Sequence, residues 1–228
     1  MSEGILHAGP CRIGTWNVHG LRNGVAAAAQ VVSAEELDVL LVQESGPRRR
    51  IRALGERLGF VVLEDPRVFP QRRIQNAVLL HPRLVGTIYS IFIRFDDAPF
   101  LQPRGASIAV IRDRMTLVST HLDLRPKRRL DQARQLRSAL HDIDTPALIG
   151  GDMNGHPSDP AVEALTERYD DAWRAAGEGE GFTMPAELPT ARIDYLFVGP
   201  ALRPLRAWTV HSTASDHVMV VAEVELDR

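Results

Sequence analysis

PALIGGDMNG, residues 146–155, is the most informative segment of the chain for its fold. It begins as a short apolar run with the length of a buried strand, and its two glycines, Gly150 and Gly151, predict that the backbone turns sharply there. Asp152 and Asn154 alternate beyond the glycines, so both side chains can face the same site. Read alone, the segment is as typical of an ordinary turn as of a site. An Asp and an Asn together can also orient a water molecule and stabilise a charged intermediate.

Further segments on both sides of this run have the apolar pattern and the flanking turn residues of strands. They cover residues 12–18, 38–44, 60–64, 74–80, 84–94, 105–111, 115–122, 192–198, 204–211 and 217–225. Helical patterns occupy residues 24–36, 47–58 and 126–142, and another helix is expected to begin at Asp159 and Pro160. These strands are too many for one sheet, and their mixture of helical and hairpin connections predicts two packed β-sheets with helices outside. Residues 176–191, rich in Gly, Pro and Glu, are expected to form a loop.

The bulk composition agrees with one domain. The chain has 228 residues, of which 44% are hydrophobic, and its formal net charge is −2. This length suits one large α/β domain as well as two small ones; we expect residues 1–11 to be a flexible leader and residues 12–228 to form a single domain. The near-neutral charge neither requires nor excludes nucleic acid, so any affinity for phosphate must be local.

The single cysteine, Cys11, cannot form an internal disulfide, which favours a reducing cytoplasm. The N-terminus has no signal-peptide pattern, and no stretch approaches the roughly 20 apolar residues that span a bilayer. We therefore expect a soluble, cytoplasmic and monomeric protein.

Like Asp152, several other polar clusters of the chain lie at the end of an apolar segment or just after it. They are centred on Asn17, Glu44, the pair His121 and Asp123, Asp194, and the pair Asp216 and His217. Such positions meet at one edge of a sheet, so we expect a common site. Taken singly, Asn17 is typical of a turn, Glu44 of a surface or capping acid, and His121 of a hydrogen-bonded structural residue.

The chemistry of these residues favours a metal and a charged substrate. Glu44 follows a continuous apolar run, where a carboxylate must be paired or bind a metal, and its hard oxygens suit Mg²⁺, Mn²⁺ or Ca²⁺. Asp194 lies among apolar strand residues and needs a partner, for which His217 is the natural candidate. Asp123 can orient the imidazole of His121 or simply accept backbone hydrogen bonds.

Two other hydrolase classes find little support in the sequence. The chain has no GxSxG segment, the turn that presents the nucleophile of many serine hydrolases. It also has neither an HExxH segment nor a cysteine pair, the usual sources of zinc ligands. Oxygen-ligated metal chemistry on a phosphate ester is the simplest interpretation that remains.

Taken in order, the motifs of the chain resemble those of the endonuclease/exonuclease/phosphatase family of deoxyribonuclease-like enzymes. They are TWNVHGL (15–21), LVQES (41–45), NAVLL (76–80), STHLD (119–123), GGDMN (150–154), RIDYLFV (192–198) and SDH (215–217). Each motif is modest evidence alone, but their order is specific, and the resemblance spans residues 12–222. It implies an α/β fold, a four-layer α/β/β/α sandwich of two mixed β-sheets flanked by helices, in agreement with the number of predicted strands.

The resemblance also implies a role for each residue of the expected site. Glu44 would be the main metal ligand, usually for Mg²⁺ with Mn²⁺ as an alternative, and Asn17 and Asp216 would lie close to the metal or its waters. Asp152 would orient the attacking water, and Asn154 would steady that water or the phosphate. His217, paired with Asp194, would contact phosphoryl oxygens or act as a base. His121 would bind phosphate or protonate the leaving group, a role usually held by tyrosine in the abasic-site branch, so its presence argues against a dedicated abasic-site repair enzyme.

The chain also departs from the family pattern at a few positions. His19 stands where the abasic-site branch has an acid, Gln75 replaces a frequent glycine, and the Arg-Pro that usually follows SDH is missing. No catalytic group is lost. By position, Asn76 is expected to support His121 or the phosphate, and Arg104 to clamp the scissile phosphate.

Basic residues follow two of the motifs and bear on the substrate. They are Arg48, Arg49, Arg50, Arg52 and Arg57 after Glu44, and Arg125, Lys127, Arg128, Arg129, Arg134 and Arg137 after His121. If these clusters border the cleft of the expected site, they favour a polyanionic substrate, DNA or RNA, whose phosphodiester bonds a nuclease would cleave. The alternative is that the clusters are solvent-exposed faces of helices. A phosphatase or phosphodiesterase of inositol phosphates or phospholipids comes second, and a non-catalytic phosphate-binding module third.

Overall fold

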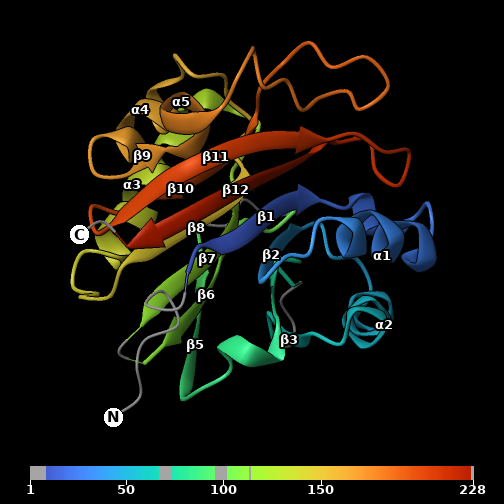
Figure 1. Ribbon diagram of the computed structural model, residues 1–228. Helices are drawn as coiled ribbons and strands as arrows, with labels where there is room; N and C mark the ends of the chain where they lie inside the picture. The colour runs from blue at the N-terminus through green and yellow to red at the C-terminus, as the bar shows by residue number, and fades with distance from the viewer. Residues whose placement is uncertain (1–8, 67–72, 96–101, 113, 227–228) are drawn as a thin grey trace.

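Two β-sheets pack face to face, with helices on both outer faces (Figure 1). The computed structural model describes residues 9–66, 73–95, 102–112 and 114–226, and within them each sheet has six strands. The expected four-layer α/β/β/α sandwich is confirmed. No helix in this described part of the chain is both long enough and apolar enough to cross a membrane.

The first sheet has the strand order β11-β12-β1-β2-β4-β3. Its strands are β1 (Cys11–Asn17), β2 (Val39–Gln43), β3 (Val61–Glu64), β4 (Ala77–Leu80), β11 (Leu202–Val210) and β12 (Met219–Leu226). The second sheet has the order β5-β6-β7-β8-β10-β9. Its strands are β5 (Ile88–Arg94), β6 (Gly105–Ile111), β7 (Met115–His121), β8 (Ala147–Asp152), β9 (Asp170–Asp171) and β10 (Asp194–Val198).

Each sheet is covered on its outer face by helices whose apolar sides are buried. Against the first sheet lie α1 (Val25–Ala34) and α2 (Arg48–Leu58), where Ile51 and Leu54 pack against Leu40 and Leu79. The second sheet is covered by α3 (Pro126–Ala139) and α4 (Pro160–Thr166), where Leu136 and Val162 join its core. Between the sheets lies a third apolar cluster that includes Ile13, Leu41, Leu117 and Leu148.

The strand directions bring the predicted motifs to one edge of the sandwich. Each sheet contains one parallel pair, β1 with β2 and β7 with β8, and the other strand pairs are antiparallel. The four parallel strands β1, β2, β7 and β8 end at or next to a site residue: Asn17, Glu44, His121 and Asp152, in that order. The antiparallel strands β4, β6, β10 and β12 begin at or shortly after another: Asn76, Arg104, Asp194 and His217, in that order. Carboxyl ends of parallel strands and amino ends of their antiparallel neighbours share an edge, so the fold gathers these residues.

Gly150 and Gly151 do not form the predicted turn, and this expectation was wrong. Both lie inside β8, and neither has a positive φ; the left-handed residue is Asn154, with φ 51°. A Cβ atom at Gly150 would lie 2.6 Å from Leu41 Cδ1 and 2.8 Å from Thr15 Cβ of the opposite sheet. Glycine is required here because the two sheets approach each other directly beneath the end of β8.

Smaller differences concern segment ends. The strand expected at 74–80 begins only at Ala77, because Gln75 has φ 59°, and the strand expected at 84–94 begins at Ile88, after the short helix η3 (Pro82–Leu84).

The predicted helix at Asp159 is confirmed, and the Asp159 side chain caps it by accepting from the Ala161 amide. The short elements β9 and α5 (Ala172–Ala176) were not predicted. Cys11, the last residue of the expected leader and also expected to be a core residue at the start of a strand, is buried and opens β1 opposite Val224. Residues 1–8 lie outside the described part.

Candidate active site

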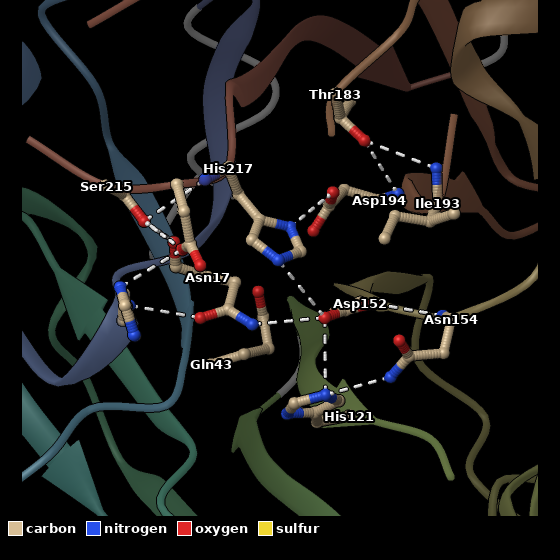
Figure 2. A network of polar contacts seen from close by, with 12 residues as sticks. Asn17, Gln43, His121, Asp152, Asn154, Thr183, Ile193, Asp194, Ser215 and His217 are labelled. Atoms are coloured by element: carbon tan, nitrogen blue, oxygen red, sulfur yellow. Dashed lines mark hydrogen bonds and ion pairs between the residues drawn. The ribbon is translucent and has the colours of Figure 1, made fainter. Parts of the chain in front are cut away.

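Asp152, the last residue of β8, is the centre of a buried polar network (Figure 2). Its Oδ2 accepts a hydrogen bond from Asn17 Nδ2 at 3.0 Å and lies 3.2 Å from His121 Nε2 and 3.8 Å from His217 Nε2. Its Oδ1 accepts from the backbone amide of Asn154 at 2.9 Å. Side chains from both sheets therefore converge on one carboxylate that is only 2% exposed.

The donors around Asp152 keep it ionised. Burial alone would raise the pKa of this carboxyl, but His121, His217 and the amide of Asn17 outweigh burial and hold the pKa well below its usual range. A cluster of N–H groups that stabilises a carboxylate also has the chemistry to hold the oxygens of a phosphate.

His217 is held between two carboxylates. Its Nδ1 lies 2.9 Å from Asp194 Oδ2, while its Nε2 faces Asp152. Burial alone would lower the pKa of His217, but Asp194 and Asp152 raise it to about 10. Burial raises the pKa of Asp194, although the neighbouring His217 opposes this effect. We assign the proton to the imidazole, because a carboxylate lies near each ring nitrogen.

Asp152, Asp194 and His217 have ligand atoms within 4.8 Å of one another, a spacing that a metal ion could also use. Here, however, the imidazolium of His217 already supplies the positive charge between the two acids. Carboxylates without such a partner are the better candidates for metal ligands.

Glu44 is such a carboxylate. It directly follows β2, it is half-buried, and its backbone has φ 47°, an uncommon conformation for a residue with a side chain. Within the described residues, its carboxylate has no hydrogen-bond or ion-pair partner. A half-buried acid on a strained backbone, whose carboxylate makes no hydrogen bond or ion pair with the described residues, fits the requirements of a hard cation.

Asp216 and Asn17 are linked by the side chain of Ser215. The Ser215 hydroxyl donates to the Asn17 carbonyl at 2.6 Å and lies 3.3 Å from Asp216 Oδ1, which also lies 3.4 Å from His19 Nδ1. Asn17 Oδ1 accepts from the His19 amide. The oxygens of Asp216 and Asn17 are hard donors of the kind that Mg²⁺ prefers, and the strand register places Asn17 opposite Gln43, next to Glu44.

His121 is contacted by Arg104 and by Asn154. Arg104 Nη1 lies 2.6 Å from His121 Nδ1, and Asn154 Nδ2 lies 3.1 Å from Nε2 and donates to the Leu122 carbonyl. Burial lowers the pKa of Arg104, although Asp152 and Glu44 oppose this effect. Asp123 does not orient the imidazole; its carboxylate accepts from the Arg125 amide and from Arg128 instead.

Asn76 lies beneath the site rather than at its surface. The side chain is fully buried, and its Nδ2 donates to the carbonyls of Gly105 at 2.8 Å and Ser119 at 3.2 Å. Gly105 directly follows Arg104 at the start of β6, and Ser119 lies two residues before His121 on β7. Contact with a phosphate would require this amide to leave its buried position, so support for His121 is the role that its position favours.

Other residues of the site were not predicted from the sequence. Thr183 Oγ1 accepts from the amides of Ile193 and Asp194 at 3.2 and 3.3 Å, and the Thr183 carbonyl accepts from Val218. Trp16 Nε1 donates to the His217 carbonyl. Thr183 lies in the segment expected to be a loop, and no sequence pattern marks it as part of the site.

Five of the eleven basic residues in the two predicted clusters form ion pairs within the protein. Arg52 pairs with Glu64, Arg129 with Asp159 and Arg137 with Glu167. Others bind carbonyl oxygens or acids: Arg48 contacts Asp65 and Glu64, Arg50 contacts Gly20, and Arg128 contacts Asp123. Of the residues in the two clusters, Arg49, Arg57, Arg125, Lys127 and Arg134 have no side-chain partner within the described part of the chain. Fewer cations than expected are therefore available to a polyanion.

Comparison with known proteins gives the same assignment as the motifs. Residues 14–217 match the model of the endonuclease/exonuclease/phosphatase family, and the chain belongs to this family. No curated protein matches it in sequence.

Solved structures of several proteins share the fold. An endonuclease/exonuclease/phosphatase from Bacteroides vulgatus is 18% identical with a TM-score of 0.81, covering 96% of this chain and 100% of that one. The mannosyl-6-phosphatase of Bacteroides thetaiotaomicron is 17% identical with a TM-score of 0.75, covering 94% and 99%. D. rerio TDP2, complexed with a single-strand DNA product, is 17% identical with a TM-score of 0.76, covering 95% and 99%. The chain is similar to all of these in fold.

Proposed function

We propose that this protein is a divalent-metal-dependent phosphodiesterase, and specifically a nuclease that hydrolyses DNA or RNA. The observation that carries the proposal is the convergence of Asn17, His121, Asn154 and His217 on Asp152. Glu44, whose carboxylate has no partner among the described residues, lies at the same edge of the sandwich. Membership of a family of phosphoesterases supports the reaction class.

The metal would be held by Glu44, with Asn17 and Asp216 at the metal or its waters. Mg²⁺ fits this oxygen donor set, and Mn²⁺ is the alternative. When bound, the ion would neutralise phosphate charge during the displacement.

The remaining residues would position the reactants for in-line attack on phosphorus. Asp152 would accept a hydrogen bond from the attacking water, and Asn154 would steady the water or a phosphoryl oxygen. His217, kept cationic by Asp194, suits the negative charge that develops on the phosphoryl oxygens. His121 and the remaining N–H groups of Arg104 would hold the phosphate from the other side.

The substrate class rests on the cationic side chains that remain unpaired. Arg125 and Lys127 are exposed and follow His121 closely, so they could hold the phosphates next to the scissile one. TDP2, complexed with its single-strand DNA product, has the same fold, which supports a nucleic-acid substrate. The internal pairing of the other arginines favours the second candidate, a phosphatase of a small phosphorylated molecule, and the mannosyl-6-phosphatase shares the fold as well.

A substrate panel separates the two candidates. Plasmid DNA, single-stranded RNA and p-nitrophenyl phosphate are each incubated with the protein and Mg²⁺ or Mn²⁺, with Asp152→Asn as the inactive control. Cleavage of the nucleic acids that the control lacks is the expected result. Hydrolysis of the monoester alone would replace the nuclease by the phosphatase.

A further inference from the structure

The two histidines beside Asp152 face opposite kinds of partner at Nδ1. His217 Nδ1 faces the carboxylate of Asp194, which can only accept a hydrogen bond when ionised. His121 Nδ1 faces the guanidinium of Arg104 at 2.6 Å, and a guanidinium can only donate. The first contact requires a proton on Nδ1, whereas the second excludes one.

This difference determines which nitrogen of His121 carries its proton. With Nδ1 accepting from Arg104, the single proton of the neutral ring must lie on Nε2, which then donates to the ionised Asp152 at 3.2 Å. The Asn154 amide, also near Nε2, has another acceptor in the Leu122 carbonyl, so it does not require a lone pair on Nε2.

The position of Arg104 is fixed by the fold. Arg104 immediately precedes β6, whose first residue, Gly105, is the register partner of His121. The Gly105 carbonyl accepts from both Asn76 Nδ2 and Thr120 Oγ1, and the Arg104 carbonyl accepts from the Phe95 amide. Within the described residues, Arg104 Nε and Nη2 have no partner, so they stay available to a substrate oxygen.

We propose that Arg104 is a positioning residue that restricts His121 to the neutral tautomer with its proton on Nε2. His121 then holds a phosphoryl oxygen by a hydrogen bond and keeps its proton throughout the reaction. It does not protonate the leaving oxygen, because a neutral imidazole that gave up its proton would become an imidazolate. The catalytic part of this inference rests on the proposed phosphodiester hydrolysis, whereas the tautomer does not.

The tautomer is measured by NMR on protein labelled with ¹⁵N in its histidines, with the His121 signals identified from their loss in His121→Gln. An unprotonated Nδ1 and a protonated Nε2 are expected for the wild type at neutral pH, and Arg104→Lys, which still donates, should keep this pattern. Arg104→Glu should move the proton to Nδ1 or add a second one. A wild-type His121 that carries its proton on Nδ1, or on both nitrogens, overturns the proposal, even if Arg104→Glu does not fold.

A matched control is provided by Arg168, whose Nη1 lies 3.1 Å from Nδ1 of the exposed His141. Arg168→Glu makes the same charge change in an arginine–histidine pair outside the site. It should alter the signals of His141 only and leave those of His121 and the turnover unchanged.

The role in catalysis is tested by leaving groups. Wild type and His121→Gln are compared on a dinucleotide and on thymidine 5′-(p-nitrophenyl phosphate), whose nitrophenolate leaves without protonation. A residue that only binds phosphate should slow both reactions by the same factor. General acids contribute about 10²–10⁴-fold, so a selective loss of that size on the dinucleotide would refute the assigned role. If neither substrate is cleaved, the proposed function fails, while the NMR result still decides the tautomer.

Discussion

His217 Nδ1 lies 2.9 Å from Asp194 Oδ2, and the opposite nitrogen of the same ring faces Asp152 at 3.8 Å. Asp194 and Asp152 are themselves register partners on β10 and β8. One antiparallel strand pair thus presents two carboxylates to one imidazole, and this arrangement accounts for the raised pKa of His217.

Asp194→Asn should slow hydrolysis strongly without unfolding the protein. The amide keeps the size of the carboxylate but cannot stabilise a cationic imidazole, so the loss should approach the roughly 10²–10⁴-fold contribution of a positioned acid or base. The rate is measured with the thermal unfolding curve. Asp170→Asn, an exposed acid on the neighbouring β9, is the matched control and should retain the wild-type rate.

Stability should depend on pH through His217. Its pKa is raised from 6.5 to about 10 in the folded protein, so the stabilisation is fully present below pH 6.5 and is lost as the pH rises through about 10. Urea unfolding of wild type and His217→Gln at several pH values measures it. The stability difference between the two should shrink steadily between these pH values, and a constant or growing difference would show that the imidazole is not held as a cation.

Gly150→Ala should destabilise the fold and disturb the site above it. The added Cβ would meet Leu41 and Thr15 of the opposite sheet at under 3 Å, and overpacking of this kind costs about 1–3 kcal/mol. Chemical denaturation gives the change in unfolding free energy. Gly86→Ala is the control, because no atom lies within 4 Å of its added Cβ. Equal stability of the two variants would contradict the close approach of the sheets at Gly150.

Asn76→Ala should lower both stability and turnover. It removes a donor from the buried carbonyls of Gly105 and Ser119, at a cost of about 1–3 kcal/mol, and frees the strand ends that carry Arg104 and His121. Denaturation and kcat are measured on the same preparation. Full turnover in this variant would remove Asn76 from the support of His121.

The fold was predictable from the sequence because its long strands carry strong apolar patterns and its motifs lie at their ends. The short elements β9 and α5 were not predictable, because two to five residues are too few to show the periodic pattern of apolar side chains that marks a strand or a helix. The role of Gly150 was missed because it depends on Leu41 and Thr15, which belong to another sheet and lie far away in the sequence.

The residues that form the site were predictable, but most of the contacts between them were not. Asp194 and His217 were paired from chemistry alone, because a buried acid needs a partner. The contact between Arg104 and His121 arises from the register of β6 and β7, which a single sequence does not specify. For the same reason Arg129 looked available to a substrate, although it is buried against Asp159.

The most direct test of the central claim is plasmid nicking by protein that has been stripped of metal with a chelator. Wild type, Glu44→Ala and His217→Ala are compared before and after addition of Mg²⁺ or Mn²⁺. Nicking should appear only in the wild type and only after a metal is added. Nicking without metal, or nicking at the wild-type rate in either variant, would contradict metal-dependent hydrolysis at this site.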